Sequence, residues 1–128
     1  MIEIPRKSAS LKVNSNLASF FWPKPAAVVV SPEEIAALLK NGALILDVRN
    51  PEEFAASHLD DAINLPVDRI AGLISERVTD KDQPLLLHCH AGVRSASAKK
   101  ILEQLGYTNL VDLGSYGQAE AILRAARG

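Results

Sequence analysis

Short apolar runs alternate along this chain with segments whose apolar positions recur at helical spacing. The runs have the length and flanks of buried strands and occupy positions 28–30, 43–48, 62–66, 85–88 and 110–113. The segments between and after them predict helices at 31–40, from 50 onward, at 68–78, at 95–105 and at 118–127. Strands that alternate with helices through short connections, and that are apolar on both faces, predict an α/β fold. We therefore expect a parallel sheet with helices on both faces.

Several of the predicted helices have clear start signals. Ser31 and Asn50 are each followed by Pro at the first helical position and by Glu at the third, which is the pattern of a capping box. We expect Asp68 to cap a third helix. Three carboxylate pairs lie at helix starts or in a turn, and we interpret them as capping and solvated charge: Glu33 and Glu34, Glu52 and Glu53, Asp60 and Asp61.

Residues 1–26 differ from the rest of the chain, because they are rich in Pro, Ser and Asn and show no sustained period. We interpret 1–26 as an N-terminal extension that precedes one domain at 27–128. Its apolar cluster at 17–22 is shorter than the central region of a secretory signal and is closed by Pro23, so we expect a cytoplasmic protein.

The composition restricts the possible function classes. The chain has 128 residues, of which 48% are hydrophobic, and this is enough for one compact domain with its own core. A formal net charge of −1 provides no general attraction to nucleic acid or to anionic lipid. No apolar run approaches the ~20 residues that span a bilayer. The single cysteine excludes an internal disulfide. No Gly-rich nucleotide fingerprint is present, and we expect no cofactor.

The single cysteine is the main candidate for chemistry. Cys89 follows the apolar run 85–88 and precedes a helix, so it lies on a strand-to-helix turn. Such a turn directs unpaired backbone N–H groups and the positive end of a helix dipole at one point, which favours an anion. Gly92 can adopt a positive φ and let these groups curl inward, and Arg94 adds a positive charge. We therefore expect Cys89 to ionise readily and to act as a nucleophile.

Neighbouring residues complete the predicted site. The backbone amides from His90 to Ser95, with Ala91, Gly92 and Val93 between them, are expected to hold a bound anion, and Arg94 to contact the substrate. Asp47 and Arg49 end the strand 43–48 at the same edge of the sheet, and we interpret them as a supporting ion pair or hydrogen-bond scaffold. His90 could also donate to an anion or relay a proton.

The remaining histidines receive no catalytic role. We expect His58 and His88 to be hydrogen-bonded structural residues. We also expect no metal site, because a second cysteine is absent and His88 points away from Cys89 on a strand.

Four motifs in order resemble the signatures of single-domain rhodaneses. They are 47–54 (DVRNPEEF), 58–66 (HLDDAINLP), 89–95 (CHAGVRS) and 105–110 (LGYTNL). The resemblance covers about 28–127 and implies a five-stranded parallel sheet and sulfurtransferase chemistry, with sulfur carried as a persulfide on Cys89. It further implies a small sulfur donor such as thiosulfate or a persulfide, and a thiol, cyanide or protein acceptor. Ser57 and Asp61 stand where the family often has Gly.

Two other function classes stay open at this stage. A Cys-dependent phosphatase or arsenate reductase of the same fold would use a thiolate and an arginine in a similar loop. The related phosphatases, however, have five residues between the two, and four separate Cys89 from Arg94. A non-catalytic binding module is the second alternative, and the presence of Cys89, Gly92 and Arg94 argues against it.

Overall fold

The computed structural model describes residues 30–128, and every structural statement below refers to these residues. Four parallel strands form one sheet in the order β2-β1-β3-β4. Their bounds are β1 Leu44–Asp47, β2 Ala62–Asn64, β3 Leu85–His88 and β4 Leu110–Gly114. The expectation of five strands is thus not met in the described residues. Positions 28 and 29 of the expected first strand lie outside them, and Val30 belongs to no strand.

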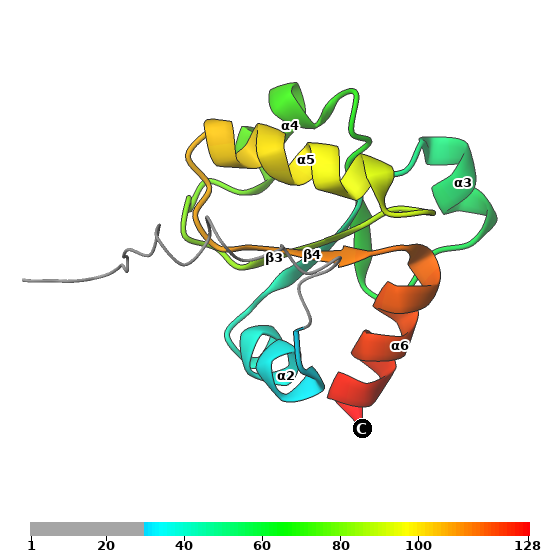
Figure 1. The fold of residues 1–128 in the computed structure, drawn as a ribbon. Coiled ribbons are helices and arrows are strands. Elements are labelled where there is room, and N and C mark those ends of the chain that lie inside the picture. The colour runs from blue at the N-terminus through cyan, green and yellow to red at the C-terminus, as the bar shows by residue number, and fades with distance from the viewer. Residues whose placement is uncertain (1–29) are drawn as a thin grey trace, which may run out of the picture.

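Helices cover both faces of the sheet, as predicted (Figure 1). Their bounds are α2 Pro32–Lys40, α3 Pro51–Ala56, α4 Ile70–Arg77, α5 Val93–Gln104 and α6 Tyr116–Arg127. The helices α4 and α5 lie on one face and α2 and α6 on the other, while α3 lies at one end of the sheet. Along each strand, successive side chains point to opposite faces of the sheet, so each strand contributes residues to both faces.

The core is therefore divided by the sheet. Leu85 and Leu87 of β3 belong to the cluster under α4 and α5, whereas Leu86, between them, packs in the cluster under α2 and α6. All three side chains are fully buried. Cys89 belongs to the first cluster, so its side chain points toward the face covered by α5. Both faces of the strand are buried here, which is why all three of these residues are apolar.

Two of the three predicted helix caps are confirmed and one is wrong. Ser31 caps α2 and Asn50 caps α3, each in a reciprocal capping box with the glutamate three residues later. Asp68 caps no helix. The backbone N–H of Arg69 instead donates to the carbonyl of Pro66 at 2.9 Å in a turn, and α4 begins only at Ile70 without a side-chain cap.

Asp61 is the one non-glycine residue at positive φ among residues 30–128, with φ of 67°. It precedes β2 in a tight turn, where the N–H of Ala62 donates to the carbonyl of Leu59 at 3.1 Å. Aspartate tolerates this left-handed conformation better than most residues do. Position 61 thus has a backbone conformation that favours glycine, the residue that single-domain rhodaneses often have there. None of the described helices is long and apolar enough to cross a membrane.

Candidate active site

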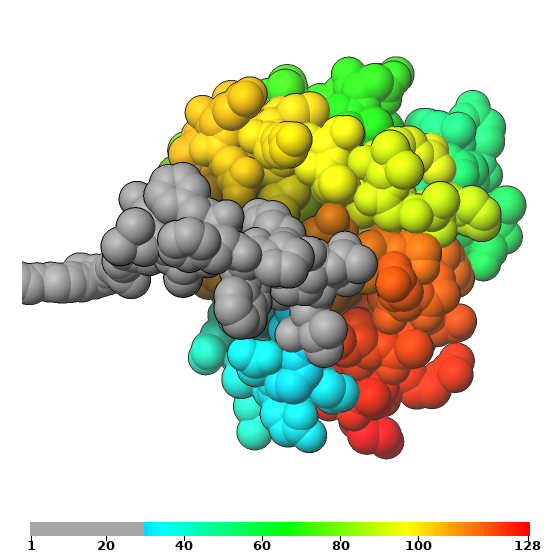
Figure 2. All heavy atoms as spheres, in the orientation of Figure 1, coloured from blue at the N-terminus to red at the C-terminus, as the bar shows by residue number. Residues whose placement is uncertain are grey.

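The candidate site lies where β3 ends at the carboxyl edge of the sheet. The N–H of Cys89 donates to the carbonyl of Gly114 at 3.0 Å, so the residue is fixed to the end of β4. The next residues form a loop that is held to the start of α6 by a bridge between Ala91 and Ser115. Figure 2 shows this loop (yellow-green) at the surface beside the first residues of α6 (orange).

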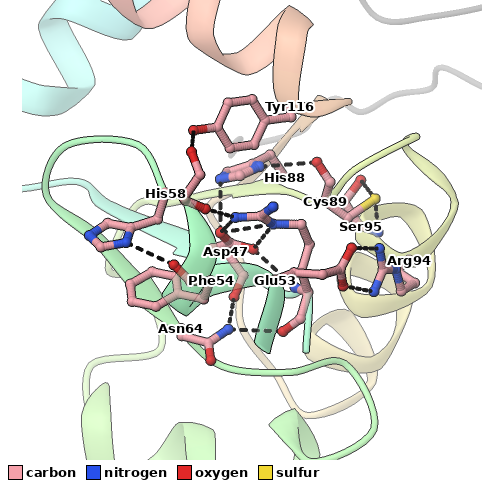
Figure 3. A network of polar contacts seen from close by, with 12 residues as sticks. Asp47, Glu53, Phe54, His58, Asn64, His88, Cys89, Arg94, Ser95 and Tyr116 are labelled. Atoms are coloured by element: carbon pink, nitrogen blue, oxygen red, sulfur yellow. Dashed lines mark hydrogen bonds and ion pairs between the residues drawn. The ribbon is translucent and has the colours of Figure 1, made fainter. Parts of the chain in front are cut away.

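The thiol of Cys89 lies in a cradle of backbone amides, of which Figure 3 shows the one from Ser95. Its Sγ accepts hydrogen bonds from the N–H of Gly92 at 3.0 Å and from the N–H of Ser95 at 3.3 Å. The hydroxyl of Ser95 lies 3.6 Å from the same sulfur. Gly92 has φ of 99°, and this left-handed turn aims its N–H at the sulfur. The predicted convergence of amides is therefore present for Gly92 and Ser95.

The other loop residues are placed differently. The amides of His90, Ala91 and Val93 make no hydrogen bond to Sγ, and the three side chains are exposed, Val93 to 73%. The carbonyl of His90 accepts from the N–H of Tyr116 at 3.1 Å, so His90 contributes to closing the loop. Cys89 itself is only 1% exposed, whereas these three side chains lie at the surface.

Arg94 is held by a carboxylate from another helix. Its Nη1 and Nη2 donate to Oε1 and Oε2 of Glu53 at 2.6 and 3.0 Å. The hydrogen bond from Arg94 is the main cause that lowers the pKa of Glu53 to about 2, and the reciprocal hydrogen bond raises the pKa of Arg94. Glu53 is the third residue of α3, so its predicted capping role is confirmed and a second role is added.

Asp47 and Arg49 form the ion pair predicted at the end of β1. The Nε of Arg49 lies 2.9 Å from Oδ1 of Asp47, and its Nη2 lies 2.7 Å from Oδ2. The same Nη2 donates to the carbonyl of Ser57 at 2.6 Å, and the guanidinium carbon lies 4.9 Å from the ring centre of Tyr116. Both residues of the pair are buried. Through these contacts Arg49 connects β1 to the loop after α3 and to α6.

The histidines outside the loop are buried or stacked. His58 stacks on Phe54 at a ring distance of 4.0 Å, and its Nδ1 lies 3.0 Å from the carbonyl of Phe54. His88 is fully buried, and its Nδ1 lies 3.2 Å from the carbonyl of Cys89, whereas its Nε2 has no hydrogen-bond partner among the described residues. Burial lowers the pKa of His88, because desolvation disfavours the imidazolium. In residues 30–128, no three His, Cys, Asp or Glu side chains gather closely enough to hold a metal ion.

Several site residues were not predicted from the sequence. The amide of Asn64 donates to the carbonyls of Asp47 and Arg49 at 3.0 and 2.9 Å, and it holds the end of β1 in place. The hydroxyls of Ser57 and Tyr116 lie 3.2 Å apart across the two segments. No local signal marks these contacts, because each joins residues that are distant in the sequence.

A cysteine cradled by amides at the strand-to-helix turn of a parallel α/β sheet defines the class of protein. Residues 31–117 match the family model described as Rhodanese-like domain. The chain therefore belongs to the rhodanese-like family.

Relatives with known names agree with this assignment. The thiosulfate sulfurtransferase PspE of Escherichia coli strain K12 is 38% identical over 69 residues, which are 54% of this chain and 66% of PspE. The matched part thus spans just under two thirds of PspE. The thiosulfate sulfurtransferase GlpE of Pseudomonas syringae is 36% identical over 81 residues, which are 63% of this chain and 74% of GlpE. These relatives confirm the predicted sulfurtransferase class.

Solved structures have the same fold. A structure described as a rhodanese with anions from E. coli is 34% identical and has a TM-score of 0.58, over 60% of this chain and 91% of that chain. The human single-domain sulfurtransferase TSTD1 is 27% identical and has a TM-score of 0.59, over 72% of this chain and 94% of that chain.

Proposed function

We propose that this protein moves a sulfane sulfur from a small donor to a thiol or cyanide acceptor through a persulfide on Cys89. The observation that carries the proposal is the pair of backbone N–H groups, from Gly92 and Ser95, that point at Sγ of Cys89. Two amides at the first turn of a helix stabilise a thiolate, which is the nucleophilic form of cysteine.

The proposed first half-reaction loads the enzyme. The Cys89 thiolate attacks the outer sulfur of thiosulfate, a sulfur–sulfur bond forms, and the donor's own sulfur–sulfur bond breaks. The electron pair of the broken bond leaves with sulfite, so neither an oxidant nor a reductant is needed. In the second half-reaction a thiol or cyanide attacks the outer sulfur of the persulfide and releases the Cys89 thiolate.

The loop residues have separate proposed roles. The Gly92 and Ser95 amides hold the inner sulfur. The amides of the exposed residues His90, Ala91 and Val93 would hold the outer sulfur. Arg94 at the loop end would contact the donor anion. Asp47 and Arg49 support the site from behind through their contacts with the Ser57 loop and Tyr116.

The proposal also names the class of sulfur donor and of sulfur acceptor. We propose thiosulfate as a donor, because the relatives PspE and GlpE are named thiosulfate sulfurtransferases. A persulfide would be a second donor for the same site. We also propose a protein thiol as acceptor, because residues of the loop are exposed at the surface. We propose a cytoplasmic location, where the single free cysteine would stay reduced between turnovers.

Intact mass spectrometry tests the proposal directly. After incubation with thiosulfate the wild-type protein should gain the mass of one sulfur atom, and a reducing thiol should remove it. The Cys89→Ser variant, which differs by one atom at the reactive position, should keep the fold and gain no mass. The enzyme hypothesis is wrong if the wild type gains no sulfur from thiosulfate or from any persulfide donor.

A further inference from the structure

The guanidinium of Arg94 is already neutralised in the resting protein. Glu53 binds it through both carboxylate oxygens, at 2.6 and 3.0 Å, and Oε1 also accepts the N–H of Asn50 at 3.1 Å. The carboxylate is thus fixed on the first turn of α3 and stays ionised at any working pH, since its pKa is lowered to about 2, mainly by Arg94. An anionic donor meets this carboxylate together with the arginine.

The pair of Glu53 and Arg94 lies beside the loop that holds the thiol. Arg94 is located between Gly92 and Ser95, whose amides contact Sγ, and Figure 3 shows Glu53 and Arg94 beside Cys89 and Ser95. The pKa of Arg94 is raised mainly by Glu53, and the charge of Cys89 is among the weaker causes.

The two ion pairs beside the loop cancel in charge. Arg49 is paired with Asp47 as closely as Arg94 is with Glu53. Beside these two neutral pairs, the two amides and the N-terminus of α5 attract an anion with partial charges only. Such a site suits a single negative charge better than two.

We propose that Glu53 is a donor-selectivity residue, whose carboxylate disfavours dianionic donors such as thiosulfate relative to alkyl hydropersulfides, R–S–SH. The inference rests on the proposed function and specifies its donor class. Thiosulfate has to approach the carboxylate with two negative charges or displace it from Arg94. A hydropersulfide carries at most one charge on its sulfurs.

The loading step with a hydropersulfide is balanced. The Cys89 thiolate attacks the outer sulfur, and the sulfur–sulfur bond of the donor breaks with its electron pair on the departing thiolate, RS⁻. The transferred sulfur stays on Cys89 with its proton. No external oxidant or reductant takes part, and the charge before and after the step is the same.

The variant Glu53→Gln tests the proposal, because Gln at the same position still completes the capping box with Asn50. We compare kcat/KM for thiosulfate and for the hydropersulfide of 2-mercaptoethanol, whose carbon chain carries no charged group. Removing one negative charge acts on both charges of thiosulfate, so its efficiency should rise by about tenfold, while that of the hydropersulfide should change by less than about threefold.

The control is Glu52→Gln, which makes the same charge change on the adjacent, exposed residue of α3. Its ratio of the two efficiencies should stay within about twofold of wild type, as expected for a screened surface charge. An equal loss with both donors in Glu53→Gln would show that Glu53 only positions Arg94 and would overturn the inference. An unchanged ratio would overturn it as well.

The wild type provides a second test that needs no variant. A site with cancelled charges should lose less than about twofold in kcat/KM for thiosulfate between about 20 and 200 mM NaCl, whereas a site with a net positive charge would lose several-fold. A steep loss would contradict the inference. Failure of the proposed function is a different result, because intact mass would then show no sulfur on Cys89 from either donor.

Discussion

Replacing Gly92 by alanine should weaken the cradle without creating a clash. A Cβ added at Gly92 would lie 3.8 Å from its nearest neighbour, the backbone N of Ser115, which is ordinary contact distance. The φ of 99°, however, is a conformation that residues with a Cβ rarely adopt. Holding alanine there costs about 1–2 kcal/mol, and the loop can relieve this strain only by rotating. The rotation turns the Gly92 N–H away from Sγ.

The expected effect on reactivity follows from this hydrogen bond. The N–H of Gly92 is the closer of the two amides at 3.0 Å, and a hydrogen bond to a charged group contributes about 1.5–3 kcal/mol. Losing it should slow the reactions of the Cys89 sulfur by about tenfold to a hundredfold, since each 1.4 kcal/mol is a factor of ten. Sulfur transfer from thiosulfate should fall by a similar factor.

The assay is the rate of alkylation of Cys89 by iodoacetamide at neutral pH, measured together with the free energy of unfolding. Gly106→Ala is the matched control, because Gly106 has φ of 96°, lies just beyond the opposite end of α5 and has its nearest neighbour at 3.9 Å. The control should lose similar stability and keep the wild-type alkylation rate. If Gly92→Ala loses stability but alkylates like wild type, the amide of Gly92 does not activate the thiol and the reasoning is wrong.

Two further predictions concern pH and substrate class. Burial lowers the pKa of His88 in the folded protein, so the unfolded chain binds a proton that the folded protein rejects. The free energy of unfolding should therefore decrease as pH falls below about 6.5, by at most about 1.4 kcal/mol per pH unit from this group, until pH has passed the folded-state pKa. The variant His88→Gln should lack that share of the slope, and the exposed His90→Gln should keep it; equal slopes in all three proteins would refute the assignment. Separately, the four residues between Cys89 and Arg94 form a ring too small for the three equatorial oxygens of a phosphoryl group, so hydrolysis of aryl phosphates should be negligible. A Cys89-dependent phosphatase efficiency equal to that with thiosulfate would contradict this prediction.

The amino-acid sequence by itself determined the features that depend on near neighbours. The strand Leu85–His88 was predicted with its observed bounds, because the run is apolar on both faces and ends directly at the turn residue Cys89. The caps at Ser31 and Asn50 were predicted because a capping box involves residues only three positions apart. The requirement for Gly92 at positive φ was likewise local.

Two helix starts differ from those predicted from local signals. Asp68 resembles a cap, but the turn at Pro66 delays the start of α4 to Ile70. The helix α6 begins at Tyr116 rather than at the predicted 118, because Ser115 and Gln118 form a capping box. That box has the same spacing as the other two, so the sequence contained the signal.

Only the tertiary structure decided which charges surround the thiol. Glu53 and Arg94 are 41 positions apart, and Ser57 and Tyr116 are 59 apart. The parallel pairing of β1 with β3 brings their carboxyl ends to one edge, and the helices that follow, α3 and α5, begin there. Their first turns can therefore meet, and the carboxylate predicted as a solvated capping charge becomes the partner of Arg94. Spacing along the chain contains no information on this contact, because it depends on the order of strands in the sheet.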